Sequence, residues 1–359
     1  MGLNIYLRKD GRYEGRIPLS SGETGRKFRY FLDRSREIVC EKMNEYLHNR
    51  TGTSGNCTKH FSEIYEEWYN DISHRVKEST CANYALKANK HLLPYFGDLP
   101  ISEITEDDIY AFIELKQNQS LSTRYIADII GVVKALFKFA VKTCHIINPT
   151  ENVSLPKRSK PEIRLLDSGE QEKLQGYIAQ NHNKTTMGVA LSMTTGVRIG
   201  ELCALQWKDI DLEKRILTVR KTMQRVQTPN GETRTKLIIT DPKSESSKRV
   251  IPITQNMANF LAEFKCSEND YVLSGCEKPI EPRTMQYRFA KILKNVNLPS
   301  VHFHALRHIF ASTCVKLGFD VKALSELLGH SSVEITLNRY VHSSFEQKKE
   351  YMDRLQFSF

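Results

Sequence analysis

Short runs in which hydrophobic and polar residues alternate open this 359-residue chain. The runs 4–8, 12–16 and 27–31 suit β-strands, and the first two flank residues 9–11 (Lys-Asp-Gly), where Asp-Gly is typical of a tight hairpin. Residues 35–48 then follow the pattern of an amphipathic helix. The start of the chain therefore predicts a three-stranded sheet followed by one helix.

Only helical patterns occur in residues 57–150. Ser79 is a candidate N-cap for one helix, because a serine side chain accepts a hydrogen bond from the unpaired N–H groups of the first turn. Acidic residues open another helix after Ile104, where they complement the positive end of the helix dipole. We predict an all-α domain with helices over 60–69, from 79 to about 94, from 104 onwards and over 122–143.

Pro149, Pro156 and Pro161 mark the next boundary, because proline disfavours helix at its own position and at the preceding one. Between them we expect an extended, basic linker. Beyond about residue 162 helical and strand-like patterns mix. We predict helices over 168–179, 186–194 and 200–207, and strands over 216–224, 236–240 and 249–253.

These patterns predict a multidomain α+β protein. A module with a small β-sheet and a helix would occupy residues 1–55, and an all-α domain residues 56–155. A mixed, mainly α domain with a small antiparallel β-sheet would occupy residues 156–359. We expect the chain to end in a tail helix over 343–355.

The formal net charge is +10, with 40% hydrophobic and 26% charged residues, which describes a globular protein with a polyanionic partner. The eight cysteines are scattered and form no CxxC pair, and no signal peptide is visible. We therefore expect reduced thiols in a cytosolic protein. The most apolar stretch, 129–147, is interrupted by three lysines and predicts no membrane span.

Basic side chains gather in several places where DNA contact is expected. Residues 1–55 contain eleven Lys and Arg against seven Asp and Glu, and arginines alternate with aromatic residues along the strands. In the helix over 122–143, three lysines recur every four residues and form a ridge. In each place the alternative is a solvated surface without a partner. The candidate DNA contacts are Arg8, Arg12, Arg16, Lys27, Arg29, Lys87, Lys90, Lys134, Lys138, Lys142, Lys157, Arg158 and Lys160.

Four separated segments, 195–202, 241–252, 304–308 and 327–342, carry residues suited to one reaction. They contain arginines, histidines, lysines and a tyrosine. Guanidinium groups are permanently charged, bidentate donors for phosphate oxygens. A phenol, with a reference pKa near 10, can attack phosphorus when a base or a positive site activates it. The combination indicates phosphodiester chemistry with tyrosine as the nucleophile.

In order and spacing, the four segments resemble the motifs of the tyrosine recombinase (phage integrase) family. The resemblance covers about 165–345. Residues 57–150 are similar to that family's core-type DNA-binding domain, and residues 1–55 to the arm-type DNA-binding module of conjugative-transposon and phage integrases. The catalytic residues that it implies are Arg198, Lys243, His304, Arg307, His330 and Tyr340, with Glu201 and His308 in support.

The resemblance also implies an activity. A member of this family would cleave and rejoin DNA strands through a 3′-phosphotyrosine and a Holliday junction, integrating and excising a mobile element. The covalent intermediate would conserve the bond energy, so no ATP is expected. Two arginines could bind the phosphate oxygens without a metal, so no metal cofactor is expected either. The implied partners are double-stranded DNA at core and arm sites, a homotetramer with tail helices packed on neighbouring protomers, and an excisionase or host DNA-bending protein.

Two assignments keep a competitor. Lys248 is an alternative to Lys243 as the general acid, because the length of the hairpin that carries this lysine varies in the family. Tyr351 is an alternative nucleophile, eleven residues after Tyr340.

Other functions also remain to be separated. A type IB topoisomerase would share the arginines, a histidine and the tyrosine, and a catalytically silent DNA-binding regulator would keep only the fold. The filled catalytic positions argue against the regulator. A zinc site at His302, His304 and His308 lacks a cysteine placed to complete a tetrahedron.

Overall fold

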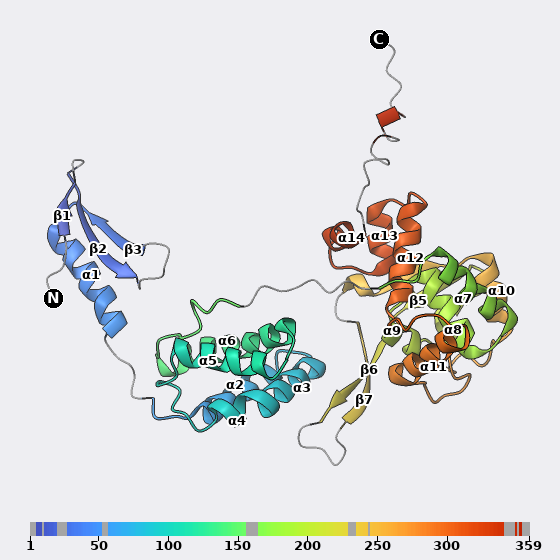
Figure 1. The fold of residues 1–359 in the computed structure, drawn as a ribbon, viewed down its shortest axis with the longest axis horizontal. Helices are drawn as coiled ribbons and strands as arrows, with labels where there is room; N and C mark the ends of the chain where they lie inside the picture. Colours follow the sequence, from blue (N-terminus) through green and yellow to red (C-terminus); the bar gives the residue numbers. More distant parts are fainter. Residues whose placement is uncertain are drawn as a thin grey trace, which may run out of the picture. The chain divides into compact units, whose positions relative to one another are not determined.

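The computed structural model divides into two compact units, residues 1–160 and 161–359 (Figure 1). The described residues are 5–8, 11–19, 27–51, 57–155, 164–228, 235–242, 245–340, 349, 352 and 353. Among them, no helix is long and apolar enough to cross a membrane. The finer domain limits at 55 and 155 stay predictions.

A small antiparallel sheet opens the first unit. Its strands β1 (Ile5–Leu7), β2 (Tyr13–Leu19) and β3 (Lys27–Asp33) pair in that order. Helix α1 (Arg36–Thr51) covers one face, where Val39 and Met43 are fully buried (Figure 1). Gly15 permits this approach, because a Cβ there would lie 2.0 Å from the Met43 sulfur. The predicted three strands and helix are confirmed.

The rest of the first unit is helical, as the pattern predicts. Its elements are α2 (Phe61–Ser73), α3 (Glu78–Lys87), the π-helical turn η1 (Ala88–Leu92), α4 (Leu93–Phe96), α5 (Glu106–Asn118) and α6 (Thr123–Cys144). Phe61, Phe96 and Phe137 are fully buried, and the rings of the latter two lie 5.4 and 6.3 Å from that of Phe61. This aromatic centre holds α2, α4 and α6 together.

The predicted N-cap at Ser79 is wrong. Helix α3 begins two residues earlier than an N-cap at Ser79 would place it, at Glu78, and Lys77 occupies the N-cap position with extended backbone angles. A carboxylate in the first turn complements the helix dipole, so Glu78 favours the earlier start. The acids predicted to open α5 are in place, and Thr105 caps that helix by accepting a hydrogen bond from the Asp108 N–H.

The second unit places two small sheets within a mainly helical domain, which confirms the α+β prediction (Figure 1). Its helices are α7 (Ser168–Gln180), α8 (Lys184–Thr195), α9 (Ile199–Ala204), α10 (Gln255–Ala262), α11 (Pro282–Asn295), α12 (Ala305–Lys316), α13 (Val321–Leu328) and α14 (Val333–Tyr340), with 3-10 turns η2 (Trp207–Asp209) and η3 (Glu245–Ser247). Strands β4 (Ile210–Asp211), β5 (Ile216–Val219) and β8 (Arg249–Pro252) form one antiparallel sheet, and β6 (Thr222–Gln227) and β7 (Thr235–Thr240) form a separate hairpin.

The single strand predicted over 216–224 is wrong. The chain forms β5 and β6 there, and the two strands belong to different sheets. Arg220 and Lys221 are both exposed, so the alternation of buried and exposed residues breaks at this point. Two adjacent charged residues cannot both face solvent in a one-sided strand, and the chain changes sheets between them.

Helix α8 offers a test of the packing that supports the second unit. A Cβ at Gly188 would lie 2.5 Å from Leu273 Cδ2 and 3.1 Å from Met285 Cε, whereas a Cβ at Gly176 on α7 would have nothing within 4 Å. We expect Gly188→Ala to lower the free energy of unfolding by about 1–3 kcal/mol through overpacking. Gly176→Ala should raise it by roughly 0.5–1 kcal/mol through helix propensity. Chemical denaturation measures both, and equal effects would contradict this packing.

Candidate active site

Helix α12 presents the predicted His-x-x-Arg pair. His304 is the N-cap residue and is exposed, whereas Arg307 in the first turn is only 2% exposed. His308 is buried, and its ring meets the His304 ring edge-on with 5.0 Å between centroids. His302, two residues before the helix cap, is exposed. No three side chains of the types that bind metal ions come together in the described part of the chain.

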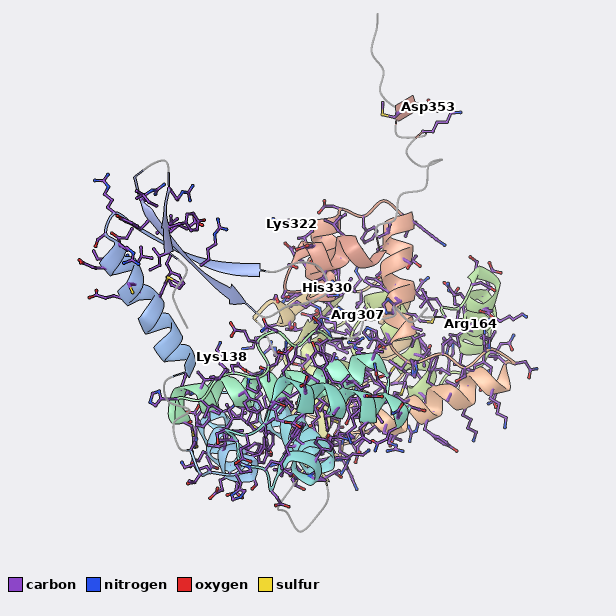
Figure 2. The ribbon with its side chains drawn as sticks, turned by 60° about the vertical axis from the view of Figure 1, so that its left-hand side comes forward. Lys138, Arg164, Arg307, Lys322, His330 and Asp353 are labelled. Atoms are coloured by element: carbon purple, nitrogen blue, oxygen red, sulfur yellow. The ribbon has the colours of Figure 1, made fainter. Side chains whose placement is uncertain are left out.

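The Arg307 guanidinium connects α12 with two other segments. Nη1 donates to the Gly196 carbonyl at 2.8 Å, and Nη2 donates to the Leu328 carbonyl at 2.6 Å. These carbonyls lie at the C-terminal ends of α8 and α13, where the helix dipole favours a cation. Leu328 lies two residues before His330, and Figure 2 labels both Arg307 and His330 in this unit.

The turn between α8 and α9 orients Arg198. Gly196 ends α8 with φ +65°, a left-handed conformation that favours glycine, and a Cβ there would lie 2.5 Å from the Phe310 ring. Arg198 follows as the N-cap residue of α9, with its side chain 35% exposed. Its Nη2 donates to the Gly329 carbonyl at 2.9 Å. The Thr-Gly-Val-Arg turn thus brings Arg198 to the end of α13.

Glu201 is the carboxylate that holds Arg198. It is 2% exposed, and it accepts hydrogen bonds from Arg198 Nη1 at 2.7 Å and from the Arg198 backbone N–H at 2.9 Å. Burial acts to raise the pKa of Glu201. The hydrogen bond and charge of Arg249, together with Arg198, outweigh burial and lower that pKa below its ordinary value. Glu201 is therefore a buried anion between two cations.

Arg249 is a charged residue of this cluster that the sequence reasoning missed. It begins β8, and its side chain is 6% exposed. It donates to both Glu201 oxygens, at 3.2 and 2.8 Å, and its Nε donates to the Leu327 carbonyl at 2.6 Å. The signal for it was its position inside the motif segment 246–252, but an arginine at the start of a short strand suggests an exposed edge.

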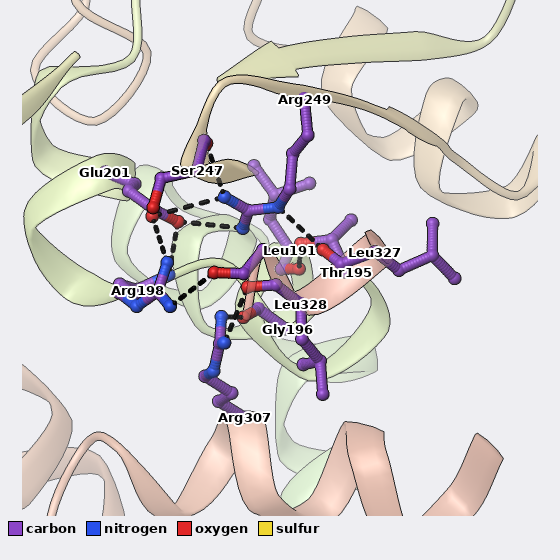
Figure 3. A network of polar contacts seen from close by, with 11 residues as sticks. Leu191, Thr195, Gly196, Arg198, Glu201, Ser247, Arg249, Arg307, Leu327 and Leu328 are labelled. Carbon is purple, nitrogen blue, oxygen red and sulfur yellow. Dashed lines mark hydrogen bonds and ion pairs between the residues drawn. The ribbon is translucent and has the colours of Figure 1, made fainter. Parts of the chain in front are cut away.

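Three guanidinium groups therefore hold successive carbonyl groups at the end of α13 (Figure 3). The pairs are Arg249 with Leu327, Arg307 with Leu328, and Arg198 with Gly329. The last carbonyls of a helix have no partner within it and form the negative end of its dipole. Cations satisfy both needs, so the arrangement fixes the helix end from which His330 emerges.

His330 follows directly from this helix end. Gly329 caps α13 with φ +63°, a left-handed conformation that favours glycine at a helix end. The His330 Nδ1 lies 2.8 Å from the Thr336 hydroxyl, and Thr336 is fully buried. Thr336 belongs to α14, whose last residue is Tyr340. One hydrogen bond thus connects the His330 ring with the helix that leads to the predicted nucleophile.

The predicted nucleophile and general acid are less completely described. Tyr340 ends α14, and its side chain lies outside the described residues. Lys243 lies outside them as well, as does the predicted tail helix over 343–355 apart from residues 349, 352 and 353, which are helical. Lys248 is described, and its Nζ lies 3.3 Å from Asp241 Oδ2.

Among the predicted DNA contacts of the sheet module, Arg8 and Arg16 share one carboxylate. Glu14 accepts hydrogen bonds from Arg8 Nη1 at 2.8 Å, from Arg16 Nε at 2.7 Å and from the Tyr6 hydroxyl. The Tyr6 hydrogen bond and the two arginines lower the pKa of Glu14. Arg12 is exposed. The side chains of Lys27, Arg29, Lys157, Arg158 and Lys160 lie outside the described part of the chain.

The predicted lysine contacts of the helical domain divide by exposure. Lys134 is half-buried on α6 and donates to the Val153 carbonyl at 3.0 Å. Lys87 on α3 is buried, with 7% exposed. Both are poorly placed to reach a partner molecule. The exposed candidates are Lys90, Lys138 and Lys142.

Models of known protein families match two parts of the chain. Residues 165–347, slightly more than half of the 359 residues, match the model described as the phage integrase family. Residues 60–116 match the model of the phage integrase N-terminal SAM-like domain.

Relatives with similar sequences carry related names. A protein of Caldanaerobacter subterraneus named "Tyrosine recombinase XerC-like" is 26% identical over 383 residues, which covers 97% of each chain. The ICEBs1 integrase of Bacillus subtilis is 25% identical over 282 residues, or 74% of each chain. The integrase of Staphylococcus phage L54a is 24% identical over 88% of this chain and 98% of its own.

Solved structures share the fold. The Tn1549 transposon integrase, in complex with a circular intermediate DNA, matches with a TM-score of 0.69 and 23% identity over 83% of this chain and 99% of its own. A lambda integrase dimer bound to a core site matches with a TM-score of 0.60 and 21% identity over 99% and 98%. With the family match over more than half of its length, the chain belongs to the phage integrase family of tyrosine recombinases, enzymes that exchange DNA strands.

Proposed function

We propose that this chain is a site-specific DNA recombinase that integrates and excises a mobile element in the bacterial cytoplasm. Its family and the integrases among its relatives support this function. The observation that carries the proposal is the meeting of Arg198, Arg307 and His330 around the end of α13, next to the helix that ends at Tyr340. Those residue types are the ones that phosphoryl transfer to a phenol requires.

Arg198 and Arg307 are the proposed ligands of the scissile phosphate. Together with Arg249 and Glu201 they form a group of three cations and one anion, an excess of two positive charges. Most of this charge is shielded from water, so it attracts an anion more strongly than surface charges would. In such a site, a donor aimed at charge that develops in the transition state contributes about 3–4 kcal/mol. The two arginines thus have the charge and geometry to act on phosphate oxygens directly.

Tyr340 is the proposed nucleophile. Its phenolic oxygen bonds to phosphorus while the bond to the 5′-oxygen breaks, which leaves a 3′-phosphotyrosine and a free 5′-hydroxyl. In this scheme His304 accepts the phenol proton, Lys243 protonates the leaving oxygen and His330 donates a hydrogen bond to the phosphate. Attack by the 5′-hydroxyl of a partner strand reverses the chemistry and rejoins the DNA. The phosphotyrosine conserves the bond energy, so no ATP is consumed.

Helix α11 is a further proposed DNA contact, which the sequence reasoning missed because its charges are spread over fourteen residues. It contains no acidic residue, and its exposed cations are Arg283, Arg288, Lys291 and Lys294. A hollow of about 300 Å³ lies between this helix and residues 300–303, directly before His304. Arg283, Tyr287 and His302 line it. This basic face could hold the DNA backbone beside the reacting phosphate.

We also propose the assembly that this chemistry requires. Residues 1–55 would bind arm sites and residues 56–155 core sites. A lambda integrase, similar in fold with a TM-score of 0.61, forms a tetramer on a Holliday junction. We propose the same assembly here, with an excisionase or a DNA-bending protein as accessory partner.

Replacing the nucleophile tests the reaction type. We expect Tyr340→Phe to form no covalent adduct with a nicked suicide substrate while it binds DNA with unchanged affinity, because only the attacking oxygen is lost. Denaturing gels and mobility-shift titrations measure the two properties. Tyr351→Phe is the matched control and should form the adduct. An adduct with Tyr340→Phe would refute the assignment, and a chain that relaxes supercoils without joining paired sites would be a topoisomerase.

The general acid can be identified with a modified leaving group. We expect Lys243→Ala to slow cleavage by about 10²–10⁴-fold. A substrate with sulfur in place of the 5′-oxygen should restore the rate, because a thiolate leaves without a proton. Lys248→Ala, whose lysine already pairs with Asp241, should cleave both substrates at nearly the original rate. If the sulfur substrate rescues Lys248→Ala instead, Lys248 is the acid.

The lysines of α6 separate DNA contact from structural support. We expect Lys138→Ala and Lys142→Ala each to weaken DNA binding and to reduce the salt dependence of the affinity by about one ion per variant. Lys134→Ala should keep that salt dependence and lower the free energy of unfolding by roughly 0.5–1.5 kcal/mol, because it removes the hydrogen bond to Val153. Binding titrations over a salt series, with denaturation as the second measurement, check the difference. A salt dependence reduced most by Lys134→Ala would contradict it.

A further inference from the structure

Arg249 is almost fully buried, and the four hydrogen bonds of its guanidinium within the described part of the chain join it to other segments or to its own loop. Its side chain is 6% exposed, against 35% for Arg198. Its Nη1 donates to the Ser247 carbonyl at 3.1 Å, in addition to the bonds to Glu201 and Leu327. Its Nε, Nη1 and Nη2 all donate to groups within the protein, so any effect of Arg249 on the reaction must pass through its neighbours.

Those neighbours belong to three segments that carry proposed catalytic residues. Glu201 is on α9, one turn from Arg198. Ser247 ends the 3-10 turn that follows Lys243 in the chain. Leu327 lies near the end of α13, three residues before His330. A single guanidinium therefore fixes the distances between three parts of the site (Figure 3).

Arg249 also changes the charge that Arg198 can offer. Glu201 alone would neutralise Arg198, because its carboxylate accepts two hydrogen bonds from that residue. Arg249 binds the same two oxygens from the other side, as a bidentate pair. The three side chains together keep one positive charge, and Arg198 is the member that solvent and substrate can reach.

We propose that Arg249 is a positioning residue for DNA cleavage. It holds Glu201 so that the carboxylate orients Arg198 without cancelling its charge, and it anchors the end of α13 before His330. This inference rests on the proposed recombinase function, because Arg198 and His330 are taken there to act on the scissile phosphate. A misplacement of about 1 Å in such a group can slow a reaction by about 100-fold.

A mutant cycle with the full-length chain tests this role. The variants are Arg249→Met, Arg249→Lys, Glu201→Gln and the double variant Glu201→Gln with Arg249→Met. Each is measured for single-turnover adduct formation on a suicide substrate, for DNA affinity, and for cleavage of the substrate with a 5′-sulfur leaving group. Thermal unfolding confirms that each variant is folded.

We expect Arg249→Met to bind DNA with unchanged affinity and to form the adduct about 100-fold more slowly. The sulfur leaving group should not rescue it, because protonation of the leaving oxygen is not what is lost. Arg249→Lys should recover part of the rate, since lysine keeps the charge but not the bidentate fork. The double variant should lose clearly less than the product of the two single losses, because the two changes share the contact between Arg249 and the Glu201 carboxylate.

Several results would overturn the proposal. One is an adduct-formation rate of Arg249→Met within about threefold of the original rate, and another is a double variant whose loss of rate is the product of the two single losses. Rescue of Arg249→Met by the sulfur substrate would also overturn it. So would a loss of DNA affinity as large as the loss of rate. If Arg249→Met does not fold, Arg249→Lys carries the test. It must fold and cleave about tenfold more slowly, and an unchanged rate would overturn the proposal. If the unaltered chain forms no adduct, the proposed function itself fails, which is a different outcome.

Discussion

The end of helix α13 is the point on which the candidate active site depends. The last carbonyl groups of a helix have no hydrogen-bond donor within the helix. Here arginines from α9, β8 and α12 donate hydrogen bonds to them. A buried polar group that loses its partner costs about 1–3 kcal/mol. The four segments can therefore hardly shift relative to one another without leaving a charge or a carbonyl unpaired. His330 follows this helix end directly, so its position is fixed by the same contacts.

Much of this arrangement could be predicted from the sequence, because short-range features set it up. Gly196 and Gly329 both adopt left-handed backbone angles at helix ends, and each stands directly before the segment that delivers Arg198 or His330. The spacing of His304 and Arg307 places both in one turn of α12. Turn chemistry and helical periodicity are local properties, so they can be recognised without knowing what packs against them.

Contacts between distant segments could not be predicted in the same way. Arg249 and Glu201 are 48 residues apart, and nothing near Arg249 in the sequence indicates that a carboxylate covers it. The change of sheet at Arg220 is a mixed case. The adjacent Arg220 and Lys221 interrupt the alternation locally, but which sheet each of the two strands joins depends on packing between distant segments. Charge patterns also mislead, because Lys87 and Lys134 are buried or bonded within their own domain. Lysines at helical spacing must share one face of the helix, but the spacing does not show whether that face is exposed to solvent.

The distribution of charge sharpens what each part of the chain can do with DNA. Residues 57–155 contain ten Lys and Arg against thirteen Asp and Glu, a net charge of −3 (10 − 13), although the whole chain carries +10. Burial lowers the pKa of Lys116. Burial also lowers the pKa of His91, and the positive charges of Lys116 and Lys90 lower it further. The charged forms of these two basic groups are therefore disfavoured. A domain of this charge cannot attract DNA from all sides. Under the proposed function, long-range attraction comes from residues 1–55 and from the second unit, and exposed lysines such as Lys138 are the proposed DNA contacts of the helical domain.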